Sequence, residues 1–144
     1  MFKRNAKRFF TDDEKKRITE TIQEAEKETS GEICVHLDSK GKGDVSDRAK
    51  LAFQKLGLTK TKHRNGILIY LSLSDQTFAI IGDEGIHARV GEEFWKEAAS
   101  KMQHAFARGD FAGGVTQVIH WLGEHLKKHF PRKTDDTNEL PALI

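Results

Sequence analysis

The stretch GILIYLSLSDQTFAII, residues 66–81, decides the fold. Its first half is almost entirely apolar, which is typical of a central strand covered on both faces. Ser74, Asp75 and Gln76 then predict a tight turn into TFAII, which has the composition of a second strand. We therefore predict an antiparallel hairpin at the centre of a small sheet.

One more strand and two helices are predicted before this hairpin. EICVHLD, residues 32–38, alternates as a strand does, and an amphipathic helix over 44–56 separates it from the hairpin. The crossover through this helix should be right-handed and should make the first two strands parallel. A first helix should begin at Thr11, which is spaced from Glu14 as in a capping box.

Two amphipathic helices are predicted after the hairpin. Asp110 is placed to cap the second of them, and ARGDFAGG contains the glycines that end the first. The complete order is helix, strand, helix, strand, strand, helix, helix. This order predicts an α/β fold, a three-layer α/β/α sandwich with a small mixed β-sheet.

Length and composition favour one folded unit. The chain has 144 residues, of which 37% are hydrophobic and 32% charged, so it is polar but rich enough in apolar residues to fold. We expect a basic N-terminal segment over 1–10, a single domain over 11–130 and a flexible C-terminal tail over 131–144. The only cysteine, Cys34, rules out an internal disulfide. No stretch has the length of a membrane span or the pattern of a secretory signal, so we expect a soluble, cytoplasmic protein.

Four ordered motifs resemble one known family. They are TSGEI before the first strand, RNGILIYLS in the second, GDEGI after the third, and FARGDFAGGV near the last helix. Together they resemble the TPM domain family, named from thylakoid, photosystem-repair and receptor-modulator members. The resemblance implies an α/β/α sandwich, binding of divalent cations, calcium in particular, and a weak acid-phosphatase activity. This chain has Asp83 and Glu84 where the family turn usually has an aromatic residue.

The edge of the sheet at the end of the hairpin is the predicted cation site. Carboxylate and amide oxygens are the ligands that calcium and magnesium prefer. The metal-ligand candidates are Asp83, Glu84, Asn65, Glu92 and Glu32. The alternative is purely local: Asp83 and Glu84 are solvated loop charges, Gly85 satisfies a positive backbone angle, and Glu92 favours the start of a helix.

The opposite edge is the second candidate site. Ligands often bind beyond the carboxyl ends of parallel strands, where Asp38, Asp44, Asp47 and Asp75 should gather. Local structure also accounts for these residues, since Asp44 is placed as a helix cap and Asp75 as a turn residue. This edge is therefore kept as the alternative to the first.

Two main function classes follow, with a third alternative. The first is a noncatalytic, calcium- or magnesium-binding interaction module with a protein partner, membrane-associated partners included. The second is a metal-assisted phosphatase with Asp83 as nucleophile or metal ligand. In the third, the basic ends, Lys3 to Arg8 and Lys127 to Lys133, bind nucleic acid or anionic membranes. No aromatic residues interleave with basic ones on the predicted strands, so nucleic acid is not expected. No P-loop, serine-nucleophile elbow, cysteine-phosphatase loop or zinc-type cluster is present in the sequence.

Overall fold

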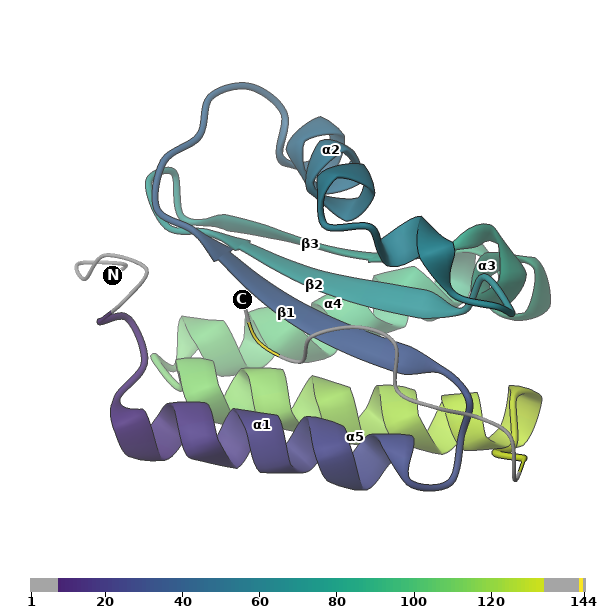
Figure 1. The fold of residues 1–144 in the computed structure, drawn as a ribbon. Helices are drawn as coiled ribbons and strands as arrows, with labels where there is room; N and C mark the ends of the chain where they lie inside the picture. The colour runs from purple at the N-terminus through teal and green to yellow at the C-terminus, as the bar shows by residue number, and fades with distance from the viewer. Residues whose placement is uncertain (1–7, 134–142, 144) are drawn as a thin grey trace.

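A computed structural model describes residues 8–133 and residue 143 of the chain. A three-stranded sheet lies between two layers of helices, which Figure 1 shows with α2 on one face and α1, α4 and α5 on the other. The elements in chain order are α1 (Asp12–Glu26), β1 (Glu32–Asp38), α2 (Val45–Lys55), the short helix η1 (Leu58–Lys60), β2 (Gly66–Ser72), β3 (Thr77–Gly82), α3 (Glu84–Val90), α4 (Glu92–Ala107) and α5 (Phe111–His129).

The sheet has the predicted topology. Its strands are ordered β1-β2-β3, with β1 and β2 parallel and β2 and β3 antiparallel. In the register, Ile69 of β2 lies opposite Val35 of β1 and Ile80 of β3. The central strand is buried along its whole length, as its nearly continuous apolar run predicts. The predicted mixed α/β fold is thus confirmed.

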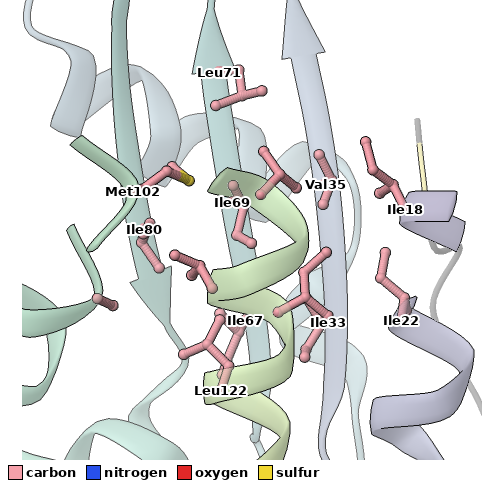
Figure 2. Close-up of a cluster of buried hydrophobic side chains, with 14 of the residues drawn as sticks. Ile18, Ile22, Ile33, Val35, Ile67, Ile69, Leu71, Ile80, Met102 and Leu122 are labelled. Carbon is pink, nitrogen blue, oxygen red and sulfur yellow. The ribbon is translucent and has the colours of Figure 1, made fainter. Parts of the chain in front are cut away.

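Apolar side chains fill both spaces between the sheet and the helices. Figure 2 shows the larger cluster, in which Ile33, Ile67 and Ile69 of the sheet meet Ile22 of α1 and Leu122 of α5. A smaller cluster under α2 is formed by Cys34, Ala49, Phe53, Leu58, Leu68 and Tyr70. Since neighbouring strand residues point to opposite faces, a single run of apolar residues in β2 supplies both clusters.

Polar side chains start three of the helices where the sequence predicts them. Thr11 accepts a hydrogen bond from the backbone N–H of Glu14, while the Glu14 carboxylate accepts one from the N–H of Thr11. Asp44 and Asp110 cap α2 and α5 through their carboxylates. These caps satisfy N–H groups that have no partner inside the helix, which sets where each helix begins.

The structure after the hairpin differs from the sequence interpretation in two ways, the presence of an extra helix and the backbone angle of Gly85. An additional seven-residue helix, α3, stands where only a turn was expected. Gly85 lies within this helix and is not among the glycines with positive φ, whereas Gly91, between α3 and α4, has a φ of 77°. The reason for glycine at position 85 is a close contact, described below.

The packed part of the chain extends beyond both predicted domain limits. Phe9 and Phe10, from the segment predicted to be a basic extension, are each only 2% exposed and belong to the core. At the other end, Pro131 pairs with Thr29, and Leu143 pairs with Val35 of β1. No helix in the described part of the chain has both the length and the apolar character to cross a bilayer.

Candidate functional site

Asp83 and Arg64 form the central ion pair of the predicted cation edge. Asp83 follows β3 directly and caps α3, since its Oδ1 accepts a hydrogen bond from the N–H of Glu84 at 2.8 Å. Arg64 donates from Nε to Asp83 Oδ2 at 2.7 Å and from Nη2 to Oδ1 at 2.9 Å. Its Nη1 lies 3.1 Å from Glu84 Oε1. The guanidinium of Arg64 therefore already supplies a positive charge to both acidic residues.

Burial distinguishes the two carboxylates. The Asp83 side chain is 6% exposed, whereas that of Glu84 is 72% exposed. The hydrogen bond to Asp83, followed by its charge and that of Glu84, raises the pKa of Arg64. Asp83 is therefore an anchored structural anion and not the solvated loop charge of the local alternative.

The loop that carries Arg64 is fixed to α3 through the backbone. The N–H of Gly85 donates to the carbonyl of Arg64 at 2.8 Å. A Cβ placed on Gly85 would lie 2.3 Å from the carbonyl oxygen of His63 and 2.6 Å from that of Arg64. Glycine is required here because two backbones approach closely, and this approach aligns Arg64 with Asp83.

A pocket of about 540 Å³ opens beside this ion pair. It lies along β3 between α2 and α4, and its lining residues are Lys50, Phe53, Gln54, Thr59, Arg64, Ile80, Ile81, Gly82, Asp83, His87, Glu92 and Trp95. Inside it, the indole Nε1 of Trp95 donates to His87 Nδ1 at 2.9 Å, and His87 Nε2 lies 3.8 Å from Glu92 Oε1. The pocket thus combines an apolar floor with charges of both signs.

The structure separates the five predicted ligands into two groups. Asp83 and Glu92 line the pocket, and Glu84 joins them through Arg64. Glu32 and Asn65 lie in the interior, 2% and 1% exposed, where the backbone N–H of Glu32 donates to the carbonyl of Asn65.

The interior group has its own hydrogen-bond pattern. Asn65 Nδ2 donates to Ser30 Oγ at 3.1 Å, while Asn65 Oδ1 is buried without a hydrogen-bond partner among the described residues. Within residues 8–133 and 143, no three His, Cys, Asp or Glu side chains are grouped so that they could hold a metal ion. The predicted ligand set therefore requires rearrangement before all its members could reach one ion.

Sequence reasoning did not identify the roles of His87 and Trp95. They lie on different helices, α3 and α4, and only the turn at Gly91 brings them together. Arg64 was visible as part of a basic loop, but nothing in its spacing from Asp83 indicated a bidentate pair. Salt-bridge partners 19 residues apart and on different elements leave no periodic signal.

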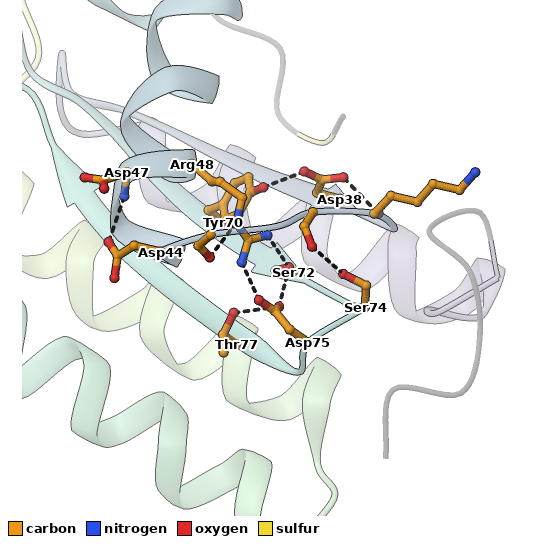
Figure 3. Close-up of polar contacts among 12 residues, drawn as sticks. Asp38, Asp44, Asp47, Arg48, Tyr70, Ser72, Ser74, Asp75 and Thr77 are labelled. Atoms are coloured by element: carbon orange, nitrogen blue, oxygen red, sulfur yellow. Dashed lines mark hydrogen bonds and ion pairs between the residues drawn. The ribbon is translucent and has the colours of Figure 1, made fainter.

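The opposite edge of the sheet carries a second network, shown in Figure 3. Arg48 of α2 donates to Ser72 Oγ at 2.7 Å and pairs with Asp75, which also accepts from Ser72 at 2.6 Å. Hydrogen bonding from Ser72 is the largest cause of the lowered pKa of Asp75. Nearby, the hydroxyl of Tyr70 donates to Asp38 Oδ2. Burial, and then this bond to Asp38, raises the pKa of Tyr70 to about 12.

Three of the four acidic residues predicted at this second edge, Asp38, Asp44 and Asp75, use their carboxylates in local structure. Asp44 accepts from the N–H of Asp47 and so caps α2, while Asp75 stabilises the hairpin turn through Thr77 as well as Arg48. Asp38 accepts the Tyr70 hydroxyl and the N–H of Lys40. The sequence interpretation of Asp44 as a cap is confirmed.

Part of the C-terminal basic cluster takes part in the fold. Lys127 Nζ lies 2.6 Å from Glu28 Oε2, and Arg132 Nη1 donates to the carbonyl of Glu26 at 3.1 Å. The N-terminal basic residues Lys3, Arg4 and Lys7 lie outside the described residues. Nucleic-acid or membrane binding by these ends stays an alternative hypothesis, with nucleic acid not expected.

Comparisons with known proteins relate this chain to solved structures. It is 42% identical to BA42 from the psychrophilic bacterium Bizionia argentinensis, with a TM-score of 0.86 over 94% of this chain and 96% of that one. The N-terminal domain of the cg2496 protein from Corynebacterium glutamicum shares the fold at 14% identity, with a TM-score of 0.68 over 94% and 84% of the two chains. An N-terminal domain from P. gingivalis does so at 20% identity, with a TM-score of 0.65 over 86% and 83%.

The curated proteins contain no match to this chain. The sequence profile of the TPM domain, in contrast, matches residues 4–124. That range includes every strand, the Asp83–Arg64 pair and the pocket beside β3. This protein therefore belongs to the TPM domain family.

Proposed function

We propose that this TPM domain is a noncatalytic interaction domain that binds a divalent cation, calcium or magnesium, at Asp83, Glu84 and Glu92. The observation that carries the proposal is that Asp83 and Glu92 line one pocket, while Arg64 beside it pairs with both Asp83 and Glu84. Because the described side chains do not form a ready-made metal site, the ion would have to draw the three carboxylates together. With Arg64 included, the formal charge of the group is negative. Calcium in particular takes six to eight oxygen ligands, so water molecules would complete the coordination shell that these carboxylates begin.

The cation would take the place of Arg64. Both oxygens of Asp83 accept hydrogen bonds from the guanidinium, so a cation at this carboxylate would compete with Arg64 and be repelled by its charge unless Arg64 moves away. The Arg64 side chain is 40% exposed and can turn into solvent. Glu32 and Asn65 would join only after leaving their buried positions, which is why the proposal rests on the three outer carboxylates.

The cation proposal predicts a gain of affinity when Arg64 is replaced. Calcium or magnesium titration, followed by NMR amide shifts, should perturb residues 83–92 in the wild type. In Arg64→Gln the affinity should rise by about tenfold or more, because the ion no longer has to compete with the two charged hydrogen bonds from Arg64 to Asp83. Arg48→Gln, at the opposite edge, is the matched control and should leave this affinity unchanged.

The same titration can contradict the proposal. Shifts concentrated at 38–47 and 75 would move the cation to the opposite edge. An absence of saturable shifts in both the wild type and Arg64→Gln would reject cation binding. Arg64→Gln with the affinity of the wild type would show that the ion does not compete with the guanidinium.

The phosphatase alternative assigns Asp83 a role that its hydrogen bonds do not favour. A nucleophilic carboxylate needs an oxygen that can approach phosphorus, and both Asp83 oxygens are held by Arg64. We therefore expect equal phosphate release from a model phosphomonoester by wild type and Asp83→Asn. A loss of activity in Asp83→Asn, with an unchanged amide spectrum outside α3, would support the enzyme instead.

A further inference from the structure

The outer edge of β3 is not paired with any described strand. The N–H of Asp83 donates to the carbonyl of Gly66 in β2, and in this register the backbone groups of Ala79 and Ile81 also face β2. The backbone N–H and C=O groups of Phe78, Ile80 and Gly82 consequently point away from β2, toward the outer edge of the sheet. Among the residues that the structure describes, no hydrogen bond to these outward backbone groups is present.

The opposite edge of the sheet, along β1, is covered by the chain itself. Glu26 Oε2 accepts a hydrogen bond from the outward N–H of Ile33 at 2.8 Å. Two residues further along, Val35 pairs in parallel with Leu143. Proteins usually protect edge strands in this way, because an open edge binds other extended chains. The contrast singles out β3 as the edge available to another chain.

A groove follows this open edge. The 540 Å³ pocket is formed by Ile80, Ile81 and Gly82 of β3 between Phe53 of α2 and Trp95 of α4. Figure 1 shows β3 at the edge of the sheet with α2 and α4 on its two sides. An extended segment can lie in such a groove with its backbone against β3.

The two walls of the groove carry opposite charges. Lys50 lies on the α2 wall, and Glu92 lies on the α4 wall with its side chain 79% exposed. Successive side chains of an added strand point to opposite faces of the sheet, one toward each wall. Adjacent acidic and basic residues in that strand would therefore face Lys50 and Glu92 respectively.

We propose that β3 is the docking edge for an extended segment of a partner protein, which adds as a fourth strand and presents neighbouring acidic and basic side chains to Lys50 and Glu92. This proposal rests on the interaction-domain part of the proposed function and names the chemistry of the partner. Backbone pairing supplies the affinity, and the two charged walls supply the preference for sequence.

The probe for this docking is the capped octapeptide Val-Thr-Val-Glu-Lys-Val-Thr-Val, added to the full chain. At saturation, amide hydrogen exchange of Phe78, Ile80 and Gly82 should slow by about tenfold or more, because these N–H groups gain partners. The amides of Ala79 and Ile81, already directed at β2, are the internal control and should change little. Binding without protection of the outward amides would overturn strand addition, as would the absence of binding.

Two further peptides separate backbone pairing from charge recognition. The isomer Val-Thr-Glu-Val-Lys-Val-Thr-Val places both charges on one face in every register, so it should bind up to about fivefold more weakly, the effect of one exposed ion pair. Methylation of the four central backbone nitrogens of the first peptide should abolish binding. Equal affinity for the two isomers would remove the charge preference, and retained binding of the methylated peptide would remove the pairing.

Controls on the protein exclude other occupants. Lys50→Glu should lose the preference between the two isomers while keeping the protected amides. Protection of Phe78 and Gly82 in concentrated protein without peptide, together with a doubled mass in sedimentation, would instead assign the edge to a second copy of this chain. The calcium titration without peptide tests the cation site independently, so either result can fail alone.

Discussion

Gly85→Ala is expected to lower the free energy of unfolding by about 3 kcal/mol, the upper part of the usual range for inserting a group into packed structure. The new Cβ would lie 2.3 Å from the carbonyl oxygen of His63 and 2.6 Å from that of Arg64. Both are backbone atoms, so the clash cannot be relieved by turning a side chain. Alanine is the better helix former by about 1 kcal/mol, which only partly offsets the clash.

The consequence for the site is a loss of alignment between Arg64 and Asp83. Relieving the clash must separate α3 from the loop and weaken the bond from Gly85 N–H to the Arg64 carbonyl. Urea unfolding measures the free energy of unfolding. The NMR shift of the Arg64 Nε–H shows whether the ion pair with Asp83 is intact. Stability at or above that of the wild type would show that the two backbones do not approach closely.

Gly91→Ala is the matched control for this experiment. Gly91 has a φ of 77° but nothing within 4 Å of an added Cβ. Its φ of 77° and ψ of 179° lie in a region almost reserved for glycine, so its replacement should cost about 1–3 kcal/mol of backbone strain but cause no clash. Gly85→Ala should shift the Arg64 Nε–H signal, whereas Gly91→Ala should leave it unchanged because the added Cβ meets no neighbouring atom. Equal shifts in the two variants would contradict the assignment of close approach to position 85.

Glu26→Gln is expected to make the protein more stable above neutral pH, by about 3 kcal/mol at most. Burial, the largest cause, raises the pKa of Glu26 from 4.5 to about 7, and the charge of Glu32 adds to it. The N–H of Ile33 and the charge of Arg132 act in the opposite direction. Glutamine keeps an oxygen that can accept the Ile33 bond but has no charge to bury.

The sign follows from proton binding. Between pH 4.5 and about 7 the folded protein keeps a proton on Glu26 that the unfolded chain has lost. The contribution of protonated Glu26 to the free energy of unfolding is therefore fully present below pH 4.5. It is lost as the pH rises through about 7. Wild type and Glu26→Gln should have similar stability near pH 4.5 and diverge up to about pH 8.

Glu28→Gln is the control, because the stability contribution of Glu28 should depend on pH in the opposite direction. Hydrogen bonding to Lys127 lowers the pKa of Glu28, so its contribution is present at neutral pH and is lost on acidification. Denaturant unfolding at several pH values gives the free energy of unfolding of the wild type, Glu26→Gln and Glu28→Gln. A constant difference between wild type and Glu26→Gln at every pH would contradict the raised pKa.

Local and periodic features of the fold were predictable. The apolar run of β2 indicated a strand buried on both faces, and Asp44 and Asp110 indicated helix starts, because a cap depends only on residues a few positions away. The short helix α3 was not predicted, since seven residues show too little periodicity to be distinguished from a turn. Phe9 and Phe10 were placed outside the domain because the basic residues before them concealed a short apolar segment.

The candidate site was predictable only in its location. Connectivity placed Asp83 and Glu84 at the same edge as the loop that carries Arg64, and the structure has them there. Whether a carboxylate binds a cation, caps a helix or pairs with arginine cannot be read from its identity, because the same oxygens serve all three. The choice at Asp83 depends on the direction of a side chain 19 residues away.

The sequence by itself determined the order of the strands and the four longer helices, the hairpin, the caps and the family, because these depend on short-range patterns and an ordered set of motifs. Only the tertiary structure decided that Arg64 holds Asp83 and that Gly85 is needed for a close approach. It also decided that β1 is covered, whereas no described strand pairs with the outer edge of β3. These features depend on side-chain directions and on contacts between distant segments. Such contacts form only when the hydrophobic core brings the segments together, so no local pattern encodes them.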